Sequence, residues 1–375
     1  MSPPPAMHGR LRLWHDSDPM SSGDQSRTEL GNRNVRVFFL FNFAQSLGRG
    51  IWMGNILSLY IVLLAEGTVG GILGLTPNEL LGVTSAITGV AMLVAVLPAG
   101  FLADLWSPRG TIAIGSLAGA VGLGFLALGS ELLSIAIGLF FWGVFIGFTR
   151  PASEAMLANS TRSGERSLIY SRAHLLEQIG SGSGPFLNVV LFLVLGDIWD
   201  LEILRSVMNV GLAVSLAAVI SVLWMNEDHT LGEESEAIGH GDAAPAPGAR
   251  LGRRDRLRRL IPIAFLASGF IIGSGAGMTV KFFPVFFRSI YGFQPVAVQL
   301  VMGTGLLVTA MATWGAQKLS RRQGRGEMIV LLQAISIACL LGMASYPPAA
   351  VVILLFVTRG ALMNATTPLS RTIVM

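Results

Sequence analysis

Ten apolar stretches, each long enough to cross a lipid bilayer as a helix, take up most of this sequence of 375 residues. Only 13% of the residues are charged and 52% are hydrophobic, whereas a soluble protein has about 25% charged residues. A single water-soluble core cannot enclose that much apolar surface. The sequence therefore predicts an all-α membrane protein with ten transmembrane helices, at residues 37–64, 79–103, 110–130, 132–156, 168–195, 203–225, 260–286, 296–317, 328–346 and 349–370.

The basic residues of the loops predict how these helices are oriented. If the helices alternate in direction, twenty lysines and arginines lie at one end of the bundle, and only Arg205 and Arg288 lie at the other. Loops rich in lysine and arginine stay in the cytoplasm. We therefore expect a cytoplasmic N-terminus in an integral, multi-pass protein whose particular membrane the sequence leaves open. The net charge of +4 is spread over many loops, which indicates membrane topology and not nucleic-acid binding.

A long polar loop divides the chain after the sixth helix. It begins acidic at Glu227, passes through a stretch rich in glycine, alanine and proline, and ends with six arginines between 250 and 259. We expect a flexible linker whose basic end anchors the next helix or contacts anionic lipid headgroups. The expected organisation is a disordered cytoplasmic tail at 1–36, an N-terminal six-helix bundle at 37–225, a cytoplasmic linker at 226–259 and a C-terminal bundle of four helices at 260–375.

A short polar turn joins the second and third apolar stretches, so these two helices must lie antiparallel beside each other. We expect Gly100 to allow close packing of two helices, and Asp104 to accept backbone N–H bonds from a nearby helix start. The turn resembles the loop signature between helices 2 and 3 of the major facilitator superfamily, G-x-x-x-D-R-x-G-R-[RK]. Three positions match that signature: Gly100, Asp104 and Arg109. Three positions depart from it: Leu105, Ser107 and Pro108.

This resemblance implies a major-facilitator-type bundle of two pseudo-symmetric halves joined by a cytoplasmic loop. Weak internal repeats agree with it, since the glycine-containing stretch at 48–53 resembles the one at 273–278, and Pro151 corresponds to Pro368. The superfamily has twelve helices, so we expect helices 11 and 12 to be missing, in either a fragment or a shortened working form. A ten-helix fold of two five-helix repeats is an alternative, but the long loop after the sixth helix disfavours it.

The fifth apolar stretch contains Gly180, Gly184 and Pro185 in the pattern G-x-x-x-G-P. This pattern is similar to a helix 5 motif of the superfamily's proton-coupled antiporters, although Asn188 stands where that motif has a glycine. Small residues one turn apart also allow simple close packing. We favour that interpretation, with the packing placed between the two halves. Leu139 stands about where the proton-coupled groups have a membrane arginine, which weakens the case for antiport.

Four basic residues lie inside the predicted spans: Arg49, Arg150, Lys281 and Arg359. A charge near the middle of a membrane helix costs about 2.5–3.5 kcal/mol, so scaffold roles account for such residues poorly. They fall on helices 1, 4, 7 and 10, which line the central cavity in the superfamily, and the resemblance thus implies a cavity that favours an anionic solute. A purely structural role stays open for two of them, because Arg150 can pair with Glu154 and Lys281 can extend to the membrane surface.

Neutral polar residues on the first and tenth helices complete the predicted substrate site. Asn42, Gln45 and Arg49 have i, i+3, i+7 spacing and therefore share one helix face. Trp52, one turn further on, is expected to stack on the solute or to gate its path. The predicted substrate-binding residues are Arg49, Asn42, Gln45, Trp52, Asn55, Arg359, Asn364 and Lys281.

Charged residues toward the cytoplasmic ends of the helices form the predicted gate. His174 lies three residues before Glu177, and such a pair could carry a proton. We favour a gate network in which Glu154 and Glu177 meet Arg150 and Arg172. The predicted gating residues are Gly100, Asp104, Arg109, Arg150, Glu154, Arg172 and Glu177.

These features predict a secondary active transporter that moves a small, anionic organic solute by alternating access. Two alternatives remain: a proton-coupled exporter of drugs or metabolites, and a truncated membrane protein that does not transport. We expect no enzyme activity, cofactor or metal site, because the sequence has no catalytic-triad spacing, no metal-ligand cluster and no nucleotide-binding loop, and Cys339 is its only cysteine. The expected partners are the solute, the lipid bilayer and, under the first alternative, protons.

Overall fold

The computed structural model describes residues 31–67, 74–162, 165–231 and 267–374. Ten helices in these residues are long and apolar enough to cross a membrane, which confirms the predicted all-α membrane fold. Most of the predicted tail (1–36) and of the predicted linker (226–259) lies outside the described residues, so both stay predictions.

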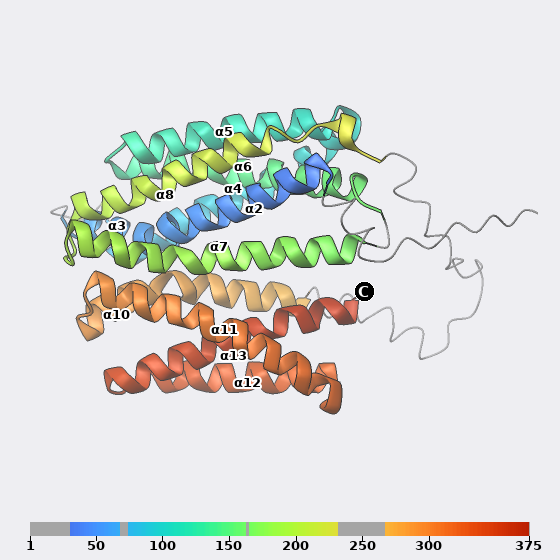
Figure 1. Ribbon diagram of the computed structural model, residues 1–375. Helices are drawn as coiled ribbons and strands as arrows, with labels where there is room; N and C mark the ends of the chain where they lie inside the picture. The colour runs from blue at the N-terminus through green and yellow to red at the C-terminus, as the bar shows by residue number, and fades with distance from the viewer. Residues whose placement is uncertain (1–30, 68–73, 163–164, 232–266, 375) are drawn as a thin grey trace, which may run out of the picture.

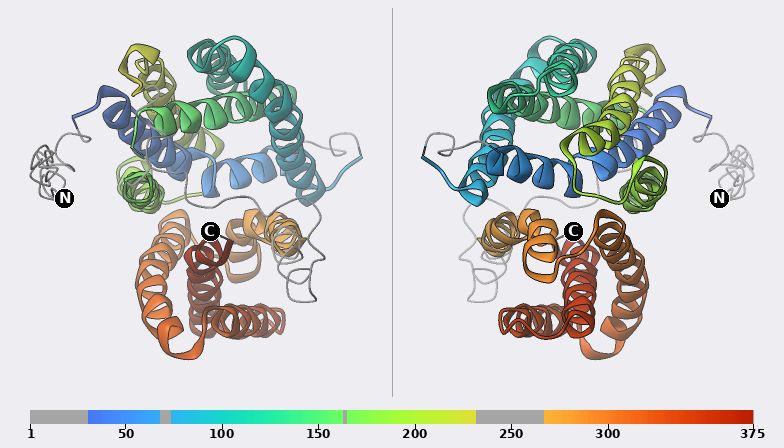
Figure 2. Two further views of the ribbon diagram at one scale, coloured as in Figure 1. Left: turned by 90° about the vertical axis from the view of Figure 1, so that its right-hand side faces the viewer. Right: turned by 90° about the vertical axis from the view of Figure 1, so that its left-hand side faces the viewer.

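The first six spans form one group of helices, coloured blue to yellow-green in Figures 1 and 2. α4 and α5 pack on α6, and α2 packs against α7 and α8. At the centre of this group the Trp142 ring lies 5.5 Å from the Trp52 ring and 4.9 Å from the Phe145 ring. The elements of the first group are α2 (Arg33–Trp52), α3 (Asn55–Glu66), α4 (Pro77–Leu105), α5 (Pro108–Leu128), α6 (Leu132–Asn159), α7 (Arg166–Leu195) and α8 (Leu201–Val222).

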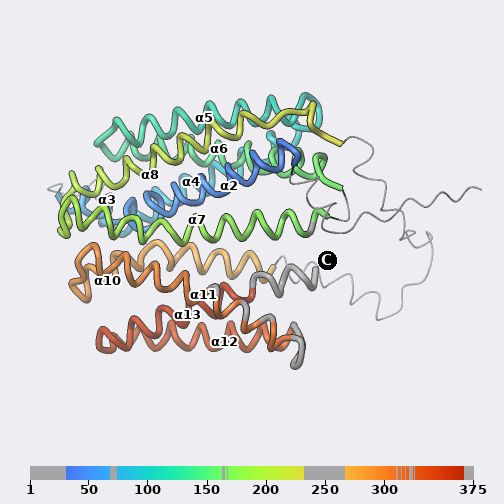
Figure 3. The backbone as a smooth tube through the Cα atoms, viewed as in Figure 1, coloured from blue at the N-terminus to red at the C-terminus, as the bar shows by residue number. Residues whose placement is uncertain are grey.

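The other four spans form a second group, coloured orange to red, which lies beside the first (Figure 3). The groups meet mainly along α7 and α11, with a further contact between α3 and α10. At this seam Gly303 makes room for Phe186, because a Cβ atom at Gly303 would lie 2.9 Å from Phe186 Cζ. The second group comprises the helical segment 267–279, the 3-10 turn η3 (Val280–Phe282), α10 (Phe283–Tyr291), α11 (Pro295–Gln323), α12 (Arg325–Met343) and α13 (Ala349–Val374).

The two ends of the bundle differ in the lysine and arginine content of their loops, and we name each end by that difference. The basic-loop end holds the turns at 106–107 and 160–162, the segment 223–231 and the turn after α11. The opposite end holds the turns at 129–131, 196–200, 292–294 and 344–348. In Figure 1 the basic-loop end is on the right and the opposite end is on the left.

The first span of each group is broken, where the sequence predicted continuous helices at 37–64 and 260–286. α2 ends at Trp52 and α3 begins at Asn55, which leaves a turn at positions 53–54. In the seventh span η3 interrupts the helix, and Pro284 occupies the first turn of α10. Proline lacks an N–H and its ring collides with the carbonyl four residues before it, which kinks or breaks a helix, and here the helix is interrupted just before Pro284. η3 contacts α3, so the two breaks face each other across the seam.

The turn between α4 and α5 is shaped by helix capping, which accounts for its departure from the superfamily signature. The Ser107 hydroxyl accepts the Gly110 backbone N–H at 2.9 Å, and Pro108 begins α5. Both residues are favoured at helix starts. The predicted close packing at Gly100 is wrong for the described part of the chain, because a Cβ atom there would meet nothing within 4 Å. α4 instead approaches glycines of α6 such as Gly143, whose Cβ would lie 2.5 Å from the α4 backbone.

Gly180 and Gly184 hold α7 close to α2. A Cβ atom at Gly180 would collide with the Ser46 side chain, and one at Gly184 would collide with the Gly50 backbone. The close packing that the sequence indicated is therefore present. Its predicted place between the two halves is corrected, since both helices belong to the first group.

We expect Gly184→Ala to lower the thermal stability of the protein in detergent, whereas Gly182→Ala is tolerated. The added methyl group at 184 meets backbone that cannot rotate away, and overpacking of this kind costs about 1–3 kcal/mol. At Gly182 the nearest atom to a new Cβ is Leu306 Cβ at 3.9 Å. Thermal unfolding monitored by size-exclusion chromatography checks this. Equal unfolding temperatures for the two variants would contradict the assigned contact.

Candidate functional site

A cavity of about 470 Å³ lies between the two helix groups. Its walls come from both breaks and from α2, α7, α11 and α13. Pro185, from the helix 5 motif, also lines it. Of the eight residues predicted to bind substrate, the structure places five around this cavity: Arg49, Asn55, Lys281, Arg359 and Asn364.

Lys281 and Arg359 contribute positive charge to this cavity from the second group. Lys281 Nζ donates a hydrogen bond to the Met53 carbonyl at 3.3 Å, in the turn between α2 and α3. The Lys281 side chain therefore crosses the seam, and it does not extend to the membrane surface. The Arg359 guanidinium lies 4.8 Å from the centre of the Phe283 ring, and its Nη2 is 3.5 Å from Thr279 Oγ1.

Neither of these two cations has a carboxylate partner within 4 Å among the described residues. The ion pairs in that part of the chain involve Arg49, Arg150, His174 and Arg288 instead. Arg359 is only 5% exposed, and its neighbours are an aromatic ring, a hydroxyl and a thioether. Buried charges in proteins are usually paired. The central cavity thus presents two cations that have no acidic partner among the described residues.

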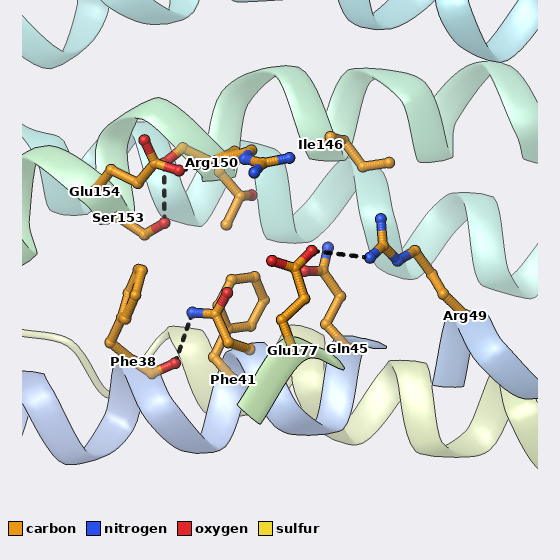
Figure 4. A pocket seen from close by; sticks show the side chains of 11 residues that line it. Phe38, Phe41, Gln45, Arg49, Ile146, Arg150, Ser153, Glu154 and Glu177 are labelled. Carbon is orange, nitrogen blue, oxygen red and sulfur yellow. Dashed lines mark hydrogen bonds and ion pairs between the residues drawn. The ribbon is translucent and has the colours of Figure 1, made fainter. Parts of the chain in front are cut away.

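Arg49, the third cation of the cavity, is paired. Its Nη2 lies 3.3 Å from Glu177 Oε1, and the other oxygen of Glu177 lies 3.7 Å from His174 Nδ1. Arg49 lines the central cavity and also a small polar pocket of about 30 Å³ between α2, α6 and α7. Figure 4 shows this pocket, with the Arg49 guanidinium turned toward the Glu177 carboxylate. Arg49 therefore lines both spaces.

Asn42 and Gln45 lie in the small polar pocket and do not line the central cavity, which corrects their predicted place in the substrate site. They do share the helix face of Arg49, as their spacing predicted. The Asn42 amide donates to the Phe38 carbonyl at 2.8 Å. Gln45 lies close to the Arg49–Glu177 pair in Figure 4.

Trp52 is fully buried inside the first group, so its predicted role in stacking on or gating the solute is also corrected. Its ring packs edge-on against Trp142, and its Nε1 donates to Ser215 Oγ at 2.9 Å. Trp52 is the last residue of α2, and its side chain is held inside the first group by these two contacts.

The predicted gate residues do not form one network in this conformation. Arg150 pairs with Glu154 one turn later at 3.2 Å, and Glu177 pairs separately with Arg49, although all four line the small pocket. Arg172 makes no hydrogen bond or ion pair with the residues that the structure describes.

Asp104 is exposed, and within the described ranges it accepts no hydrogen bond. The carboxylate at the start of α5 is that of Glu227, which accepts the Arg109 backbone N–H at 3.2 Å. The Arg109 side chain donates to Asn226 Oδ1 at 3.1 Å. Arg109 thus ties the α4–α5 turn to the segment after α8, a contact within the first group.

Contacts that the sequence did not reveal join the two groups at the opposite end. Arg288 donates two hydrogen bonds to the Glu66 carboxylate, at 3.0 and 2.9 Å. Nearby, two hydrogen bonds of 2.8 Å involve the turn after α7: Trp199 Nε1 to the Phe293 carbonyl, and the Val296 N–H to Asp197 Oδ1. In the sequence, the only indication of the ion pair was that Glu66 and Arg288 are isolated charged residues near the ends of their spans.

Gln299 was also missed, and it links the groups deeper in the membrane. It is fully buried, and its Oε1 accepts from Asn55 Nδ2 at 3.2 Å and from Asn188 Nδ2 at 3.3 Å. Asn188 donates as well to the Ile51 carbonyl at 3.0 Å. An isolated amide inside an apolar span is a usable signal for such a contact.

These features define an integral, multi-pass membrane protein in which two helix groups share a central cavity lined by three basic residues. Residues 38–375 match the sequence model of the Major Facilitator Superfamily. The chain belongs to that superfamily.

Known proteins agree with this assignment. An uncharacterized MFS-type transporter of Methanocaldococcus jannaschii is 28% identical over 209 residues, which cover 55% of this chain and 49% of that protein. The matched region thus spans about half the length of this curated relative.

Solved structures share the fold. A D-xylose-proton symporter has a TM-score of 0.64 at 17% identity, with 88% of this chain and 79% of that chain covered. The nucleoside transporter NupG has a TM-score of 0.62 at 16% identity, with 91% of this chain and 82% of that chain covered. At such identities the likeness shows the fold alone.

Proposed function

We propose that this protein is a secondary transporter, not an enzyme, and that it moves a small organic anion by alternating access. The observation behind the proposal is the pair Lys281 and Arg359, which line one cavity between the two helix groups and have no carboxylate within 4 Å among the described residues. Membership of the superfamily and the likeness in fold to a sugar symporter and a nucleoside transporter support transport as the activity.

The cavity favours an anion for an energetic reason. A lysine or arginine at the level of the hydrocarbon core costs about 2.5–3.5 kcal/mol, and a carbonyl, a hydroxyl or an aromatic face offsets only part of that cost. A carboxylate or similar group bound between Lys281 and Arg359 would supply the missing negative charge and accept charge-assisted hydrogen bonds. Asn55 and Asn364 line the same cavity and add neutral polar contacts for the rest of the solute.

Alternating access requires the contacts at the opposite end to break. Arg288 and Glu66 are 20% and 42% exposed, and exposed ion pairs contribute only about 0–1 kcal/mol. Separation at that end also breaks the hydrogen bonds of Trp199 and of the Val296 N–H. We place the basic-loop end, and with it the N-terminus, in the cytoplasm because of the excess of lysine and arginine in those loops.

We expect Arg359→Gln and Lys281→Gln each to weaken binding and uptake of organic anions by roughly tenfold to hundredfold, because each removes a charged hydrogen bond worth about 1.5–3 kcal/mol. Uptake of labelled carboxylates into proteoliposomes, with binding to the purified protein, measures this. Arg205→Gln is the matched control, since Arg205 lies at the opposite end and binds the Ala127 carbonyl.

The same two variants separate transport from a scaffold role. Removing an unpaired buried cation relieves its desolvation cost, so the variants should unfold at the same or a higher temperature than the wild type. Reduced stability with unchanged uptake would mean that Arg359 serves its contact with Phe283, and would contradict the proposal. Arg359→Lys should retain part of the binding.

A second candidate function, proton-coupled transport, is favoured by the position of Arg49. Arg49 pairs with Glu177 and also lines the central cavity, so its guanidinium can hold the carboxylate or turn to a bound anion. Protonation of Glu177 would release Arg49 to the anion, which couples one proton to one solute. His174, Arg150 and Glu154 are the other ionisable groups near Glu177.

We expect an imposed proton gradient to accelerate anion uptake by the wild type and to have no effect on Glu177→Gln, whose amide mimics the protonated acid. Glu154→Gln is the control, because Glu154 lines the same pocket but pairs with Arg150. Uptake into proteoliposomes at fixed external pH, with and without the gradient, is the measurement. A Glu177→Gln variant that still responds fully to the gradient would rule out this coupling site.

A further inference from the structure

A second cavity, of about 180 Å³, adjoins the central one. It lies between α3, α4 and α6, and Met53 and Lys281 line both cavities. We call it the apolar annex. Six apolar side chains make up most of its wall: Leu57, Ile61, Leu81, Met92, Leu139 and Ile146.

The annex offers little to a polar ligand. Among the residues that line it, Lys281 alone is charged, and it stands at the border with the central cavity. Four hydroxyls line the annex: those of Ser58 and Thr84 donate to the Gly54 and Leu80 carbonyls, at 3.0 and 2.9 Å, and those of Ser85 and Thr88 make no hydrogen bond among the described residues. Water in such a space finds few hydrogen-bond partners. An apolar group of a ligand would lose its hydration there at little cost in polar contacts.

We propose that the apolar annex binds the hydrocarbon part of the transported solute, so that the solute is an amphipathic anion. Its charged group lies at Lys281 and Arg359 in the central cavity, and its apolar part extends past Met53 into the annex. This inference rests on the proposed function and specifies the substrate class of that site. We assign the annex to the solute because it adjoins the central cavity at Lys281, the cation that has no acidic partner among the described residues.

The position of Gly89 allows the annex to be filled without disturbing the fold. Gly89 lines the annex, and a Cβ atom added there would meet nothing within 4 Å. Gly82 lies two turns earlier on the same helix and has equally open surroundings, but does not line the annex. Gly89→Phe and Gly82→Phe therefore form a matched pair that differ in whether the ring enters the annex.

The test is titration of butane-, hexane- and octanesulfonate, which stay anionic at any working pH, into the protein in phosphatidylcholine nanodiscs, with empty nanodiscs subtracted. Burial of each methylene should tighten binding to the wild type and to Gly82→Phe by about fourfold. Gly89→Phe should weaken octanesulfonate by at least about tenfold and change butanesulfonate by less than about twofold, because only the longer chain reaches the annex.

The outcomes separate the two proposals. If all three sulfonates bind with equal affinity, and Lys281→Gln abolishes that binding, the anion site stands and the annex proposal is overturned. Equal affinities caused by a lipid acyl chain that occupies the annex would overturn the annex proposal in the same way. Equal weakening of all three sulfonates by Gly89→Phe would also overturn it. Failure of every sulfonate to bind would overturn both the annex and the proposed function.

Discussion

A charge at the level of a bilayer's hydrocarbon core must meet water, an opposite charge or a polar ligand, and this constraint organises the structure. Arg49, Lys281 and Arg359 come from three spans that are distant in sequence, yet all three line the cavity between the helix groups. Two groups of helices that pack around a shared space keep these cations away from lipid. Arg49 then receives Glu177 as a partner, whereas Lys281 and Arg359 are left for a bound anion.

The breaks in the first and seventh spans show how backbone takes part in the same site. Each break lies in the first helix of its group, and the two meet at the seam. The break after α2 frees the Met53 carbonyl from helical pairing and offers it to Lys281. Irregular backbone inside a membrane is tolerated where it lines a cavity instead of lipid. The Gly54 turn and the start of α10 at Pro284 thus determine where the cavity widens.

The sequence predicted the ten spans and the three charges that line the cavity, because length, hydropathy and cost of burial are properties of the chain itself; the fourth predicted charge, Arg150, lines only the small polar pocket. It could not predict how each helix is rotated. In a soluble protein polar residues mark the outer face, but lipid is as apolar as a protein core. Leu81 and Leu93 of α4 read alike in sequence, yet they are 1% and 70% exposed. Because helix rotation could not be predicted, Trp52 was placed in the cavity and Gly100 in a packed contact. The hydrogen bonds of Gln299 to Asn55 and Asn188 could not be predicted either.

The central claim is that an anion occupies the space between Lys281 and Arg359, with its apolar part toward Met53. The most direct measurement is a crystal structure of the protein with 4-iodobenzoate, in which anomalous scattering locates the iodine. The account predicts a carboxylate within hydrogen-bond distance of Lys281 or Arg359 and an iodine peak in the apolar annex. A peak confined to the lipid-facing surface, with both cations paired to carboxylates of the protein, would contradict it.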